Sequence, residues 1–292
     1  MENSVVNTTL MAFPSGSLPI RATSPRRIAT LCAISLLRRV RRRFGDVLFL
    51  TSTICVKYGD SVDLAEAASM EFVRQHTSVP VPKVHCAFKH QGQTYIVMER
   101  IQGQKLAVGW LERSEESKLH LLAQLRSLVD EIRTLKPRHG SSVCSVDGGS
   151  LFDMRLPGLG VTYPTPTSRR FGPFEDIALF HLWLRRPVEK VENKNYPEVN
   201  SLVTMHDTTD WGSPIFTHGD LSSLNVLVRG ESIVGIVDWE TAGWYPSYWE
   251  YTTASQVNFR NEMWAAYIDK FLEPRPTELE MERIRMKYFG DT

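Results

Sequence analysis

The chain is poor in several features that mark particular classes of protein. It has 292 residues but only four cysteines, with no CxxC pair, so we expect reduced thiols rather than a disulfide framework or a cysteine zinc site. No apolar run approaches the length of a membrane span. The net charge of +1 argues against broad electrostatic binding of nucleic acid. A hydrophobic fraction of 42% is ordinary for a globular protein, and the length favours two lobes.

The first 43 residues have no lysine and a single acid, Glu2, but eight arginines. A basic, acid-poor leader of this kind fits an organelle transit peptide, or a basic helix on a membrane surface or on RNA. A plainer interpretation is favoured, because Pro14, Pro19 and Pro25 interrupt the first half. It is a poorly ordered extension in which Leu31–Arg43 forms one helix packed on the first lobe.

The most informative stretch is Phe216–Glu250. Two short apolar runs, Val226–Val228 and Ile233–Val237, flank a four-residue turn, a pattern that predicts a β-hairpin. The hairpin brings three polar residues to one end, namely Asp220, Asn225 and Asp238. Two carboxylates and an amide placed in this way suit the binding of Mg²⁺ and the positioning of a hydroxyl nucleophile at a nucleotide's phosphates. Any one of the three alone is as easily a turn residue that bonds nearby backbone.

The segments HGDLSSLN (218–225) and IVDWETAGWYP (236–246) resemble the aminoglycoside phosphotransferase family, a branch of the protein-kinase-like fold. They are similar to the kinase catalytic loop H-R-D-x-x-x-x-N and to the later metal-binding Asp. Gly219 stands in place of the Arg, as in the small-molecule kinases of this family. The resemblance implies Asp220 as the catalytic base, Asn225 and Asp238 as Mg²⁺ ligands, and His218 as a brace for the loop.

The first lobe offers a lysine for the nucleotide phosphates. The runs Val47–Leu50 and Ile54–Lys57 predict a hairpin whose second strand ends on Lys57. This strand is similar to the kinase strand V-A-I-K, whose lysine contacts the phosphates. The triplet KYG is typical of fungal members of the family.

An amphipathic helix is predicted over Asp63–Gln75, with Asp63 near its start. The family pattern indicates Glu66 as the acid that pairs with Lys57 and orients it. Glu71, the other candidate, is expected to face solvent. An ordinary acid in the first helical turn, favoured by the helix dipole, stays open as the alternative for Glu66.

A second hairpin, from Val84–Phe88 and Thr94–Met98, leads into the residues that would join the lobes. In kinase-like folds the backbone of this hinge binds the adenine edge, so the resemblance implies Glu99 and Ile101 as nucleotide-binding positions. The chain has no GxGxxG loop over the phosphates, only Gly45 before the first strand. The residues that cover the nucleotide are therefore not assigned, and a shortened first lobe is an open alternative.

The second lobe begins with the clearest helix of the sequence. Apolar residues recur every three or four positions over Glu115–Leu135, between the N-cap residue Ser114 and Pro137, and predict a core helix. The stretch His139–Pro173 is irregular and rich in Gly, Ser and Pro. The resemblance places it over the substrate cleft, where weak substrate contacts are implied for Asp147, Asp153 and Arg155.

Further helices are predicted over 174–185, 196–207, 256–272 and 277–289. The aromatic residues between positions 243 and 251 are expected to pack beneath the metal loop rather than to stack on a substrate. Four acids either form a wall for a cationic aminosugar or belong to a solvated face; they are Glu250, Glu262, Asp269 and Glu273.

The sequence therefore predicts an α+β, bilobal protein-kinase-like fold. A basic extension (1–43) precedes a small antiparallel-sheet N-lobe (44–100) and a larger, mainly helical C-lobe (101–292). The resemblance implies a phosphotransferase that uses Mg²⁺ and moves the γ-phosphate of ATP or GTP to a hydroxyl of a small molecule. The expected location is the cytoplasm, or an organelle if the leader is a targeting signal.

Two other functions compete with this one. The missing glycine-rich loop leaves a catalytically silent nucleotide- or ligand-binding protein as the main alternative. A metal-dependent phosphohydrolase built on His206, Asp207, His218 and Asp220 is disfavoured, because the remaining histidines lack suitable spacing.

Overall fold

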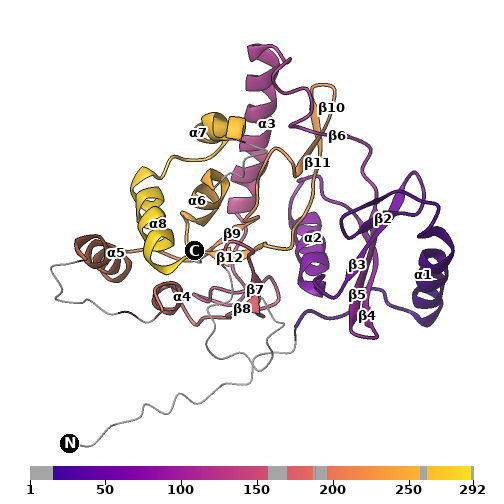
Figure 1. Ribbon diagram of the computed structural model, residues 1–292, viewed down its shortest axis with the longest axis horizontal. Coiled ribbons are helices and arrows are strands. Elements are labelled where there is room, and N and C mark those ends of the chain that lie inside the picture. Colours follow the sequence, from indigo (N-terminus) through magenta and orange to yellow (C-terminus); the bar gives the residue numbers. More distant parts are fainter. Residues whose placement is uncertain (1–15, 157–169, 187, 189–195, 257–261, 291–292) are drawn as a thin grey trace, which may run out of the picture.

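The computed structural model of the chain describes residues 16–156, 170–186, 188, 196–256 and 262–290. These residues form an N-lobe built on a five-stranded sheet and a larger C-lobe of helices and three small sheets (Figure 1). The α+β architecture with an antiparallel-sheet N-lobe is as predicted.

The N-lobe sheet is antiparallel throughout, in the order β1-β2-β3-β5-β4. Its strands are β1 (Arg43–Phe44), β2 (Val47–Phe49), β3 (Ile54–Gly59), β4 (Val84–His90) and β5 (Gln93–Glu99). Both predicted hairpins are present. Gln91 and Gly92 join β4 to β5 with φ angles of +50° and +76°, the left-handed conformation that a two-residue hairpin turn requires. Lys57 lies in the central strand β3, opposite Val47 of β2 and Ile96 of β5.

Two helices cover the two faces of this sheet (Figure 1). α2 (Leu64–His76) lies between the sheet and the C-lobe, and α1 (Ser24–Leu37) covers the outer face, where Ile34 is buried with Leu48 and Val56. The predicted helix over residues 31–43 is therefore misplaced. Pro25 sits in the first turn of α1, where the N–H that proline lacks has no helical partner. This proline begins the helix instead of interrupting it.

The C-lobe contains α3 (Glu115–Arg133), α4 (Ile177–Leu184), α5 (Pro197–Thr208), α6 (Trp249–Ser255), a 3₁₀ helix (Glu262–Tyr267), α7 (Ile268–Phe271) and α8 (Pro276–Phe289). α3 is confirmed, and the Ser114 hydroxyl accepts a hydrogen bond from the Ser117 N–H at 3.2 Å, which caps its start. The single helix predicted over 256–272 is wrong, because a 3₁₀ helix and the short α7 occupy the described part of that range.

Three small sheets connect these helices. They pair β6 (Gln104–Lys105), β10 (Val226–Arg229) and β11 (Ser232–Ile236); β9 (Ile215–Thr217) and β12 (Gly243–Tyr245); and β7 (Leu151–Phe152) and β8 (Arg170–Phe171). The stretch predicted to be irregular thus includes a short two-stranded pairing, and its residues 157–169 lie outside the described residues. In the ranges that the structure describes, no helix is both long and apolar enough to cross a membrane.

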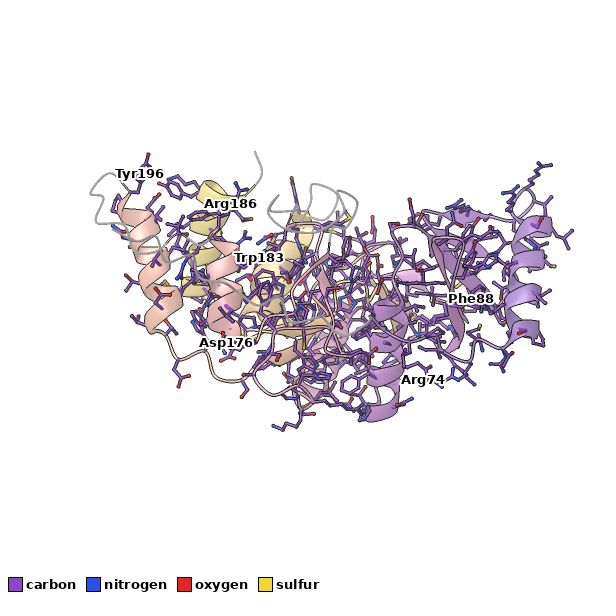
Figure 2. The ribbon with its side chains drawn as sticks, turned by 90° about the horizontal axis from the view of Figure 1, so that it is seen from below. Arg74, Phe88, Asp176, Trp183, Arg186 and Tyr196 are labelled. Carbon is purple, nitrogen blue, oxygen red and sulfur yellow. The ribbon has the colours of Figure 1, made fainter. Side chains whose placement is uncertain are left out.

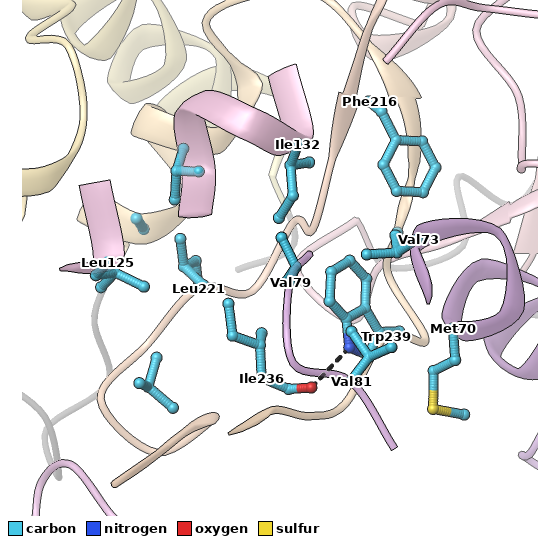
Figure 3. Close-up of a cluster of buried hydrophobic side chains, with 14 of the residues drawn as sticks. Met70, Val73, Val79, Val81, Leu125, Ile132, Phe216, Leu221, Ile236 and Trp239 are labelled. Atoms are coloured by element: carbon cyan, nitrogen blue, oxygen red, sulfur yellow. Dashed lines mark hydrogen bonds between the residues drawn. The ribbon is translucent and has the colours of Figure 1, made fainter. Parts of the chain in front are cut away.

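The two lobes share one hydrophobic core. Met70 and Val73 of α2 are buried in the same cluster as Ile132 of α3 and Trp239 after β11 (Figure 3). The Trp239 indole N–H donates to the Ile236 carbonyl at 2.9 Å, so the ring is fixed where α2 meets the C-lobe. Separate clusters lie under α1 and among α4, α5 and α8; Figure 2 shows Phe88 and Tyr196 at these opposite ends of the molecule.

Candidate active site

The predicted hairpin exists and aligns the three polar residues. β10 and β11 pair antiparallel, with Val226 opposite Ile236, and the Val237 N–H donates to the Asn225 carbonyl at 2.9 Å. Asn225 and Asp238 therefore leave the same end of the hairpin. The loop from β9 to β10 carries Asp220 to this end as well. The structure brings together the three residues that the sequence singled out.

Asp220 and Asn225 are in direct contact. The Asn225 amide nitrogen donates to the Asp220 carbonyl at 2.8 Å and to its Oδ2 at 2.7 Å. Removal from water raises the pKa of Asp220 to about 6, while the Arg155 cation opposes the rise. The side chain is still 46% exposed, so a ligand can reach the carboxylate.

Lys57 crosses from the N-lobe into this site. Its Nζ lies 2.9 and 3.0 Å from the two carboxylate oxygens of Glu66 in α2, which is the pairing that the resemblance implies. The same nitrogen lies 2.8 Å from Asp238 Oδ1 and 2.9 Å from Glu240 Oε2, both of the C-lobe. One ammonium group thus faces three carboxylates from two lobes.

The charges of this cluster shift the pKa of each member. Burial alone would lower the pKa of Lys57, but Glu66, Asp238 and Glu240 raise it well above its usual range. Burial favours the protonated form of Asp238, yet Lys57 holds its pKa below the usual range. Burial raises the pKa of Glu66 to about 7 against the opposing effect of Lys57. Because both Glu66 oxygens lie within 3.0 Å of the ammonium, we assign the carboxylate form to it.

Asp238 has an unusual backbone. Its φ is +68°, in the left-handed region that aspartate adopts more readily than most other residues. This conformation follows directly after β11 and turns the chain away from the strand, while Asp238 Oδ1 remains 2.8 Å from Lys57 Nζ. Residues held in such conformations concentrate at functional sites.

His218 braces the loop, as the resemblance implies. Its Nε2 lies 3.1 Å from the Val237 carbonyl, and its Nδ1 accepts the Asp220 N–H at 3.2 Å. Burial lowers the pKa of His218 to about 4. The ring is therefore neutral at neutral pH, with its proton on Nε2 for the carbonyl.

Glu250 of α6 supports the same loop from beneath. Its two carboxylate oxygens accept the His218 N–H at 2.7 Å and the Gly219 N–H at 3.1 Å. Burial raises the pKa of Glu250, and these two backbone donors oppose the rise. The prediction that Glu250 belongs to an acidic wall for a cationic ligand is wrong, because the side chain is buried and satisfied by backbone. Its role could not be read from the sequence, where it appears only as one acid in an aromatic stretch.

The other members of the expected acidic wall are also accounted for. Asp269 accepts a hydrogen bond from the Tyr251 hydroxyl at 2.9 Å, and Glu273 pairs with Arg275 at 2.7 Å. Glu262 is exposed at the start of the 3₁₀ helix. The aromatic residues around them are core residues as predicted, since Trp244, Tyr245 and Trp249 are among the most deeply buried side chains.

Glu71 does not face solvent. Its side chain is 12% exposed and forms an ion pair with Arg21, which lies three residues before the start of α1 and also donates to the Val84 carbonyl. The sequence interpretation missed this pair because it treated the leader as separate from the N-lobe. Glu71 thus anchors the leader, while Glu66 pairs with Lys57.

The remaining residues predicted for the nucleotide site lie in the hinge and in the β1–β2 hairpin. The Glu99 N–H donates to the Lys83 carbonyl at 2.9 Å, so it is occupied. Ile101 makes no backbone hydrogen bond among those found within the described ranges, and its side chain packs on Gly235 of β11. Gly45, with a φ of +55°, lies in the turn of the β1–β2 hairpin. Phe44, the residue before Gly45, contacts the C-lobe, because Lys105 Nζ lies 4.6 Å from the centroid of its ring.

The three weak substrate-contact predictions have different outcomes. Asp147 is exposed, with no site residue among its contacts in the described chain. Asp153 is 2% exposed and bound to Arg155, so it cannot meet a substrate directly. Arg155 reaches the Asp220 loop itself, because its guanidinium donates to the Gly219 carbonyl.

A histidine-based metal centre is not supported. His206 stacks on His181 with ring centroids 4.0 Å apart, and Asp207 pairs with Arg185 at 2.8 Å. Over the described part of the chain, the one group of metal-ligating side chains that converge is Glu66, Asp238 and Glu240, which includes no histidine. Among the described residues, these side chains therefore do not form the His/Asp metal site that the phosphohydrolase alternative requires.

Two cavities lie away from the Asp220 loop and Lys57. One of about 490 Å³ lies beside α1 and includes Arg26, Lys83 and His85 in its lining. Another of about 360 Å³ adjoins the hinge and is lined by Glu99 and Ile101 among others. Neither contains the Asp220 loop or Lys57, so the site is defined by the convergence of its side chains and not by cavity size.

Comparison with known proteins agrees with this geometry. Residues 63–281 match the phosphotransferase enzyme family, and the chain belongs to this family. The match covers the Asp220 loop and Asp238 but begins after Lys57. No curated protein matches the chain.

Solved structures share the fold. A thermostable mutant of the aminoglycoside phosphotransferase APH(4)-Ia, in ternary complex with AMP-PNP and hygromycin B, is 15% identical, with 89% of this chain and 88% of that chain covered and a TM-score of 0.55. The streptomycin–ATP–APH(2")-IIa ternary complex is 13% identical, with coverages of 92% and 90% and a TM-score of 0.54. ADP-bound APH(2'')-Ib is 14% identical, with coverages of 87% and 85% and a TM-score of 0.51. The kinase-like fold predicted from the sequence is confirmed.

Proposed function

We propose that the protein is a small-molecule O-phosphotransferase that moves the γ-phosphate of ATP or GTP to a hydroxyl group. The observation that carries the proposal is the meeting of two lobes at one point. Lys57 of the N-lobe lies 2.8 Å from Asp238, and the backbone bond between Val237 and Asn225 ties Asp238 to the Asp220 loop. Phosphoryl transfer needs a cation for the phosphates, metal ligands and a base for the acceptor in one cleft.

The donor set suits Mg²⁺. The Asn225 amide nitrogen is committed to Asp220, which leaves the amide oxygen for a cation, and Asp238 adds a carboxylate. Oxygen ligands of this kind are those that Mg²⁺ prefers. We propose Asn225 and Asp238 as the residues that hold the ion, which when bound would neutralise charge on the phosphates.

The protein's own residues divide the remaining work. Lys57, oriented by Glu66, would anchor the phosphates, and the backbone at Glu99 and Ile101 would hold the base of the nucleotide. Asp220 Oδ2 is bonded to Asn225, so Oδ1 is the oxygen left to align the acceptor hydroxyl and take its proton. A base with a pKa of about 6 is ionised at neutral pH and still able to accept a proton.

The acceptor class is the least defined part. The structural neighbours were solved with hygromycin B or streptomycin, which makes aminoglycosides one arm of a test. We propose that the acceptor is a hydroxylated small molecule and that the protein belongs to a fungal-type branch of the family. We also propose that it acts in the cytoplasm or, if the Arg-rich leader is a targeting signal, in an organelle. The division at residues 43 and 100 stays a proposal, although α1 packs on the sheet as part of the N-lobe core.

The test is a γ-phosphate transfer screen with labelled ATP and GTP in the presence of Mg²⁺, against aminoglycosides and a panel of hydroxylated metabolites. The wild-type protein should label at least one acceptor, and the Asp220→Asn protein should label none above background. Equal labelling by both proteins would refute the assigned base.

A catalytically silent nucleotide- or ligand-binding protein is the second candidate. It is favoured by the short β1–β2 hairpin, in which strands of two and three residues replace a longer phosphate-covering loop. Isothermal titration with Mg-ATP, run beside a hydrolysis assay, separates the two. Binding without hydrolysis or transfer would select the silent protein.

A further inference from the structure

The catalytic loop carries no cation of its own. The kinase pattern has an arginine before the catalytic aspartate, where this chain has Gly219. Gly219 has a φ of +82°, and a Cβ there would lie 3.0 Å from the Thr241 carbonyl oxygen and 3.1 Å from the Thr241 hydroxyl. A side chain here would therefore strain the backbone and press on Thr241. His218 is neutral, since burial lowers its pKa to about 4.

Arg155 brings a guanidinium to this loop from a distant part of the sequence. It follows β7, 64 residues before Gly219, and its Nη2 donates to the Gly219 carbonyl. Its Nη1 donates to the Thr253 carbonyl of α6 at 3.3 Å and lies 3.9 Å from Asp220 Oδ1. The same group thus ties the peptide at position 219 to α6 and places a positive charge beside the carboxylate of Asp220.

Asp153 fixes the orientation of this guanidinium. Asp153 Oδ1 accepts the Arg155 Nε–H at 2.8 Å and Oδ2 accepts the Nη2–H at 2.7 Å. Oδ1 also accepts the Arg155 backbone N–H at 2.9 Å. Asp153 is 2% exposed, so this two-point pair is held away from water, where such geometry is strong and directional.

We propose that Arg155 is a positioning residue for phosphoryl transfer, which supplies from another segment the guanidinium that the catalytic loop lacks and sets the place of Asp220. The inference rests on the proposed function. Its physical reason is that glycine has an unusually flexible backbone. Glu250 binds only the N–H of Gly219, and the Arg155 bond to the Gly219 carbonyl adds a second restraint. A displacement of about 1 Å at a reacting group is enough to lower a rate about 100-fold.

The test compares three variants once an acceptor, or water as acceptor in ATP hydrolysis, gives a measurable rate. Arg155→Gln keeps a hydrogen-bonding side chain without the charge or the fork, and Arg155→Lys keeps the charge alone. Arg113→Gln is the matched control, because Arg113 also donates to a carboxylate, that of Glu231 at 3.0 Å, and to a glycine carbonyl, that of Gly230 at 3.1 Å. Arg113 touches no residue of the site.

For Arg155→Gln we expect kcat to fall about 100-fold while KM for the nucleotide changes less than about threefold, since the misplaced group is the base. Arg155→Lys should recover only part of kcat, because a lysine cannot reproduce the two-point pair with Asp153. Arg113→Gln should match the wild type. A kcat for Arg155→Gln within about threefold of the wild type, or a loss that appears in KM instead, would overturn the inference.

Hydrogen exchange of the nucleotide-free protein separates this inference from the proposed function. The amides of residues 219–225 should exchange faster in Arg155→Gln and Arg155→Lys than in the wild type, with other segments unchanged. If the wild type transfers phosphate to no acceptor, the proposed function fails, and faster exchange still supports the restraint of the loop by Arg155. Unchanged exchange in a folded variant refutes that restraint whatever the activity. Should Arg155→Gln fail to fold, Arg155→Lys carries both measurements.

Discussion

The two halves of the candidate site are held by different forces. The Asp220 half lies within the C-lobe, where backbone N–H and carbonyl groups meet His218, Glu250 and Arg155. The Lys57 half is assembled from both lobes, and one ammonium group among three carboxylates holds it together. The position of Asp220, the proposed base, is therefore fixed within the C-lobe, whereas the Lys57 half, the proposed phosphate-binding part, is free to rearrange when a charged ligand enters.

The sharpest way to separate the halves is to remove the proposed base, Asp220, alone. Asp220→Asn keeps the shape and one hydrogen-bonding oxygen but cannot take a proton. We expect kcat to fall about 1,000-fold, within the range for loss of a general base. The affinity for Mg-nucleotide, measured by titration calorimetry, should stay within about threefold of the wild type, because the Lys57 half is intact.

Asp207→Asn is the control for this change. Asp207 pairs with Arg185 at 2.8 Å and has no contact with the site, so both rate and affinity should be those of the wild type. A large loss of nucleotide affinity in Asp220→Asn would mean that the two halves are not independent.

The Lys57 half should respond to loss of its cation through stability. Lys57→Met leaves Glu66, which is 2% exposed, without a partner, and breaking a buried pair in this way costs about 3–5 kcal/mol. The free energy of unfolding in denaturant measures the effect. The double variant Lys57→Met/Glu66→Met should recover most of the loss, since neither charge then remains.

Lys118→Met provides the comparison for that experiment. Lys118 is also buried but pairs at 2.7 Å with Glu115, whose side chain is 75% exposed, so the acid left behind is hydrated. Its cost should be well below that of Lys57→Met, because an ion pair with a solvated acid contributes little to stability. If Lys57→Met were no more costly than Lys118→Met, the charged half would not depend on its ammonium group.

The same contrast explains what could be predicted from the sequence. Asp220, Asn225 and Asp238 stand at fixed offsets around one hairpin, so local spacing was enough to bring them together. The pairing of Lys57 with Glu66 was instead implied by the family resemblance, which pointed to these positions in a strand and in the helix that follows it. Local patterns together with the resemblance were enough to predict the α+β fold and most of the residues that the structure brings together.

The contacts that could not be predicted join segments far apart in the chain. Arg155 binds Gly219 across 64 residues, and Glu250 binds the N–H groups of His218 and Gly219 across 32 and 31 residues. No local pattern marks either contact. The pair of Arg21 and Glu71 likewise joins segments far apart in the chain. Pro25 was misinterpreted because proline occurs both in the first turn of helices and where helices end. Such pairings depend on tertiary packing, which local sequence patterns do not reveal.

The hydrogen-bonded half can be tested through Glu250. Glu250→Ala leaves the His218 and Gly219 N–H groups without an acceptor in a buried position, and unsatisfied donors of this kind cost about 1–3 kcal/mol each. We therefore expect the free energy of unfolding to fall by about 3 kcal/mol, with Glu250→Gln losing about half as much because it keeps one acceptor. Glu131→Ala is the control, since Glu131 accepts the Ser78 N–H at 2.7 Å at an exposed position where water replaces it. Equal costs for the two alanine variants would contradict the buried role of Glu250.

Acid should weaken the hydrogen-bonded half through His218. Its pKa is about 4 in the folded protein and about 6.5 when unfolded, so between these values the unfolded chain binds the extra proton. The free energy of unfolding is therefore highest above about pH 6.5 and falls as the pH drops toward about 4. The loss that His218 causes is about 2 kcal/mol at pH 5. His181 and His206, whose pKa values burial lowers to about 3 and about 2, add contributions of the same sign.

The share of His218 is measurable by difference. His218→Gln should reduce the loss of unfolding free energy between pH 7 and pH 5 by about 2 kcal/mol relative to the wild type, because one of the three buried histidines no longer titrates. His120→Gln, on the exposed surface of α3, should leave the pH dependence as it is. If both variants changed the pH dependence of the unfolding free energy equally, a neutral His218 in the folded protein would be excluded. If neither did, His218 would already be accessible to protons in the folded state, and the contrast between a hydrogen-bonded half and a charged half would no longer hold.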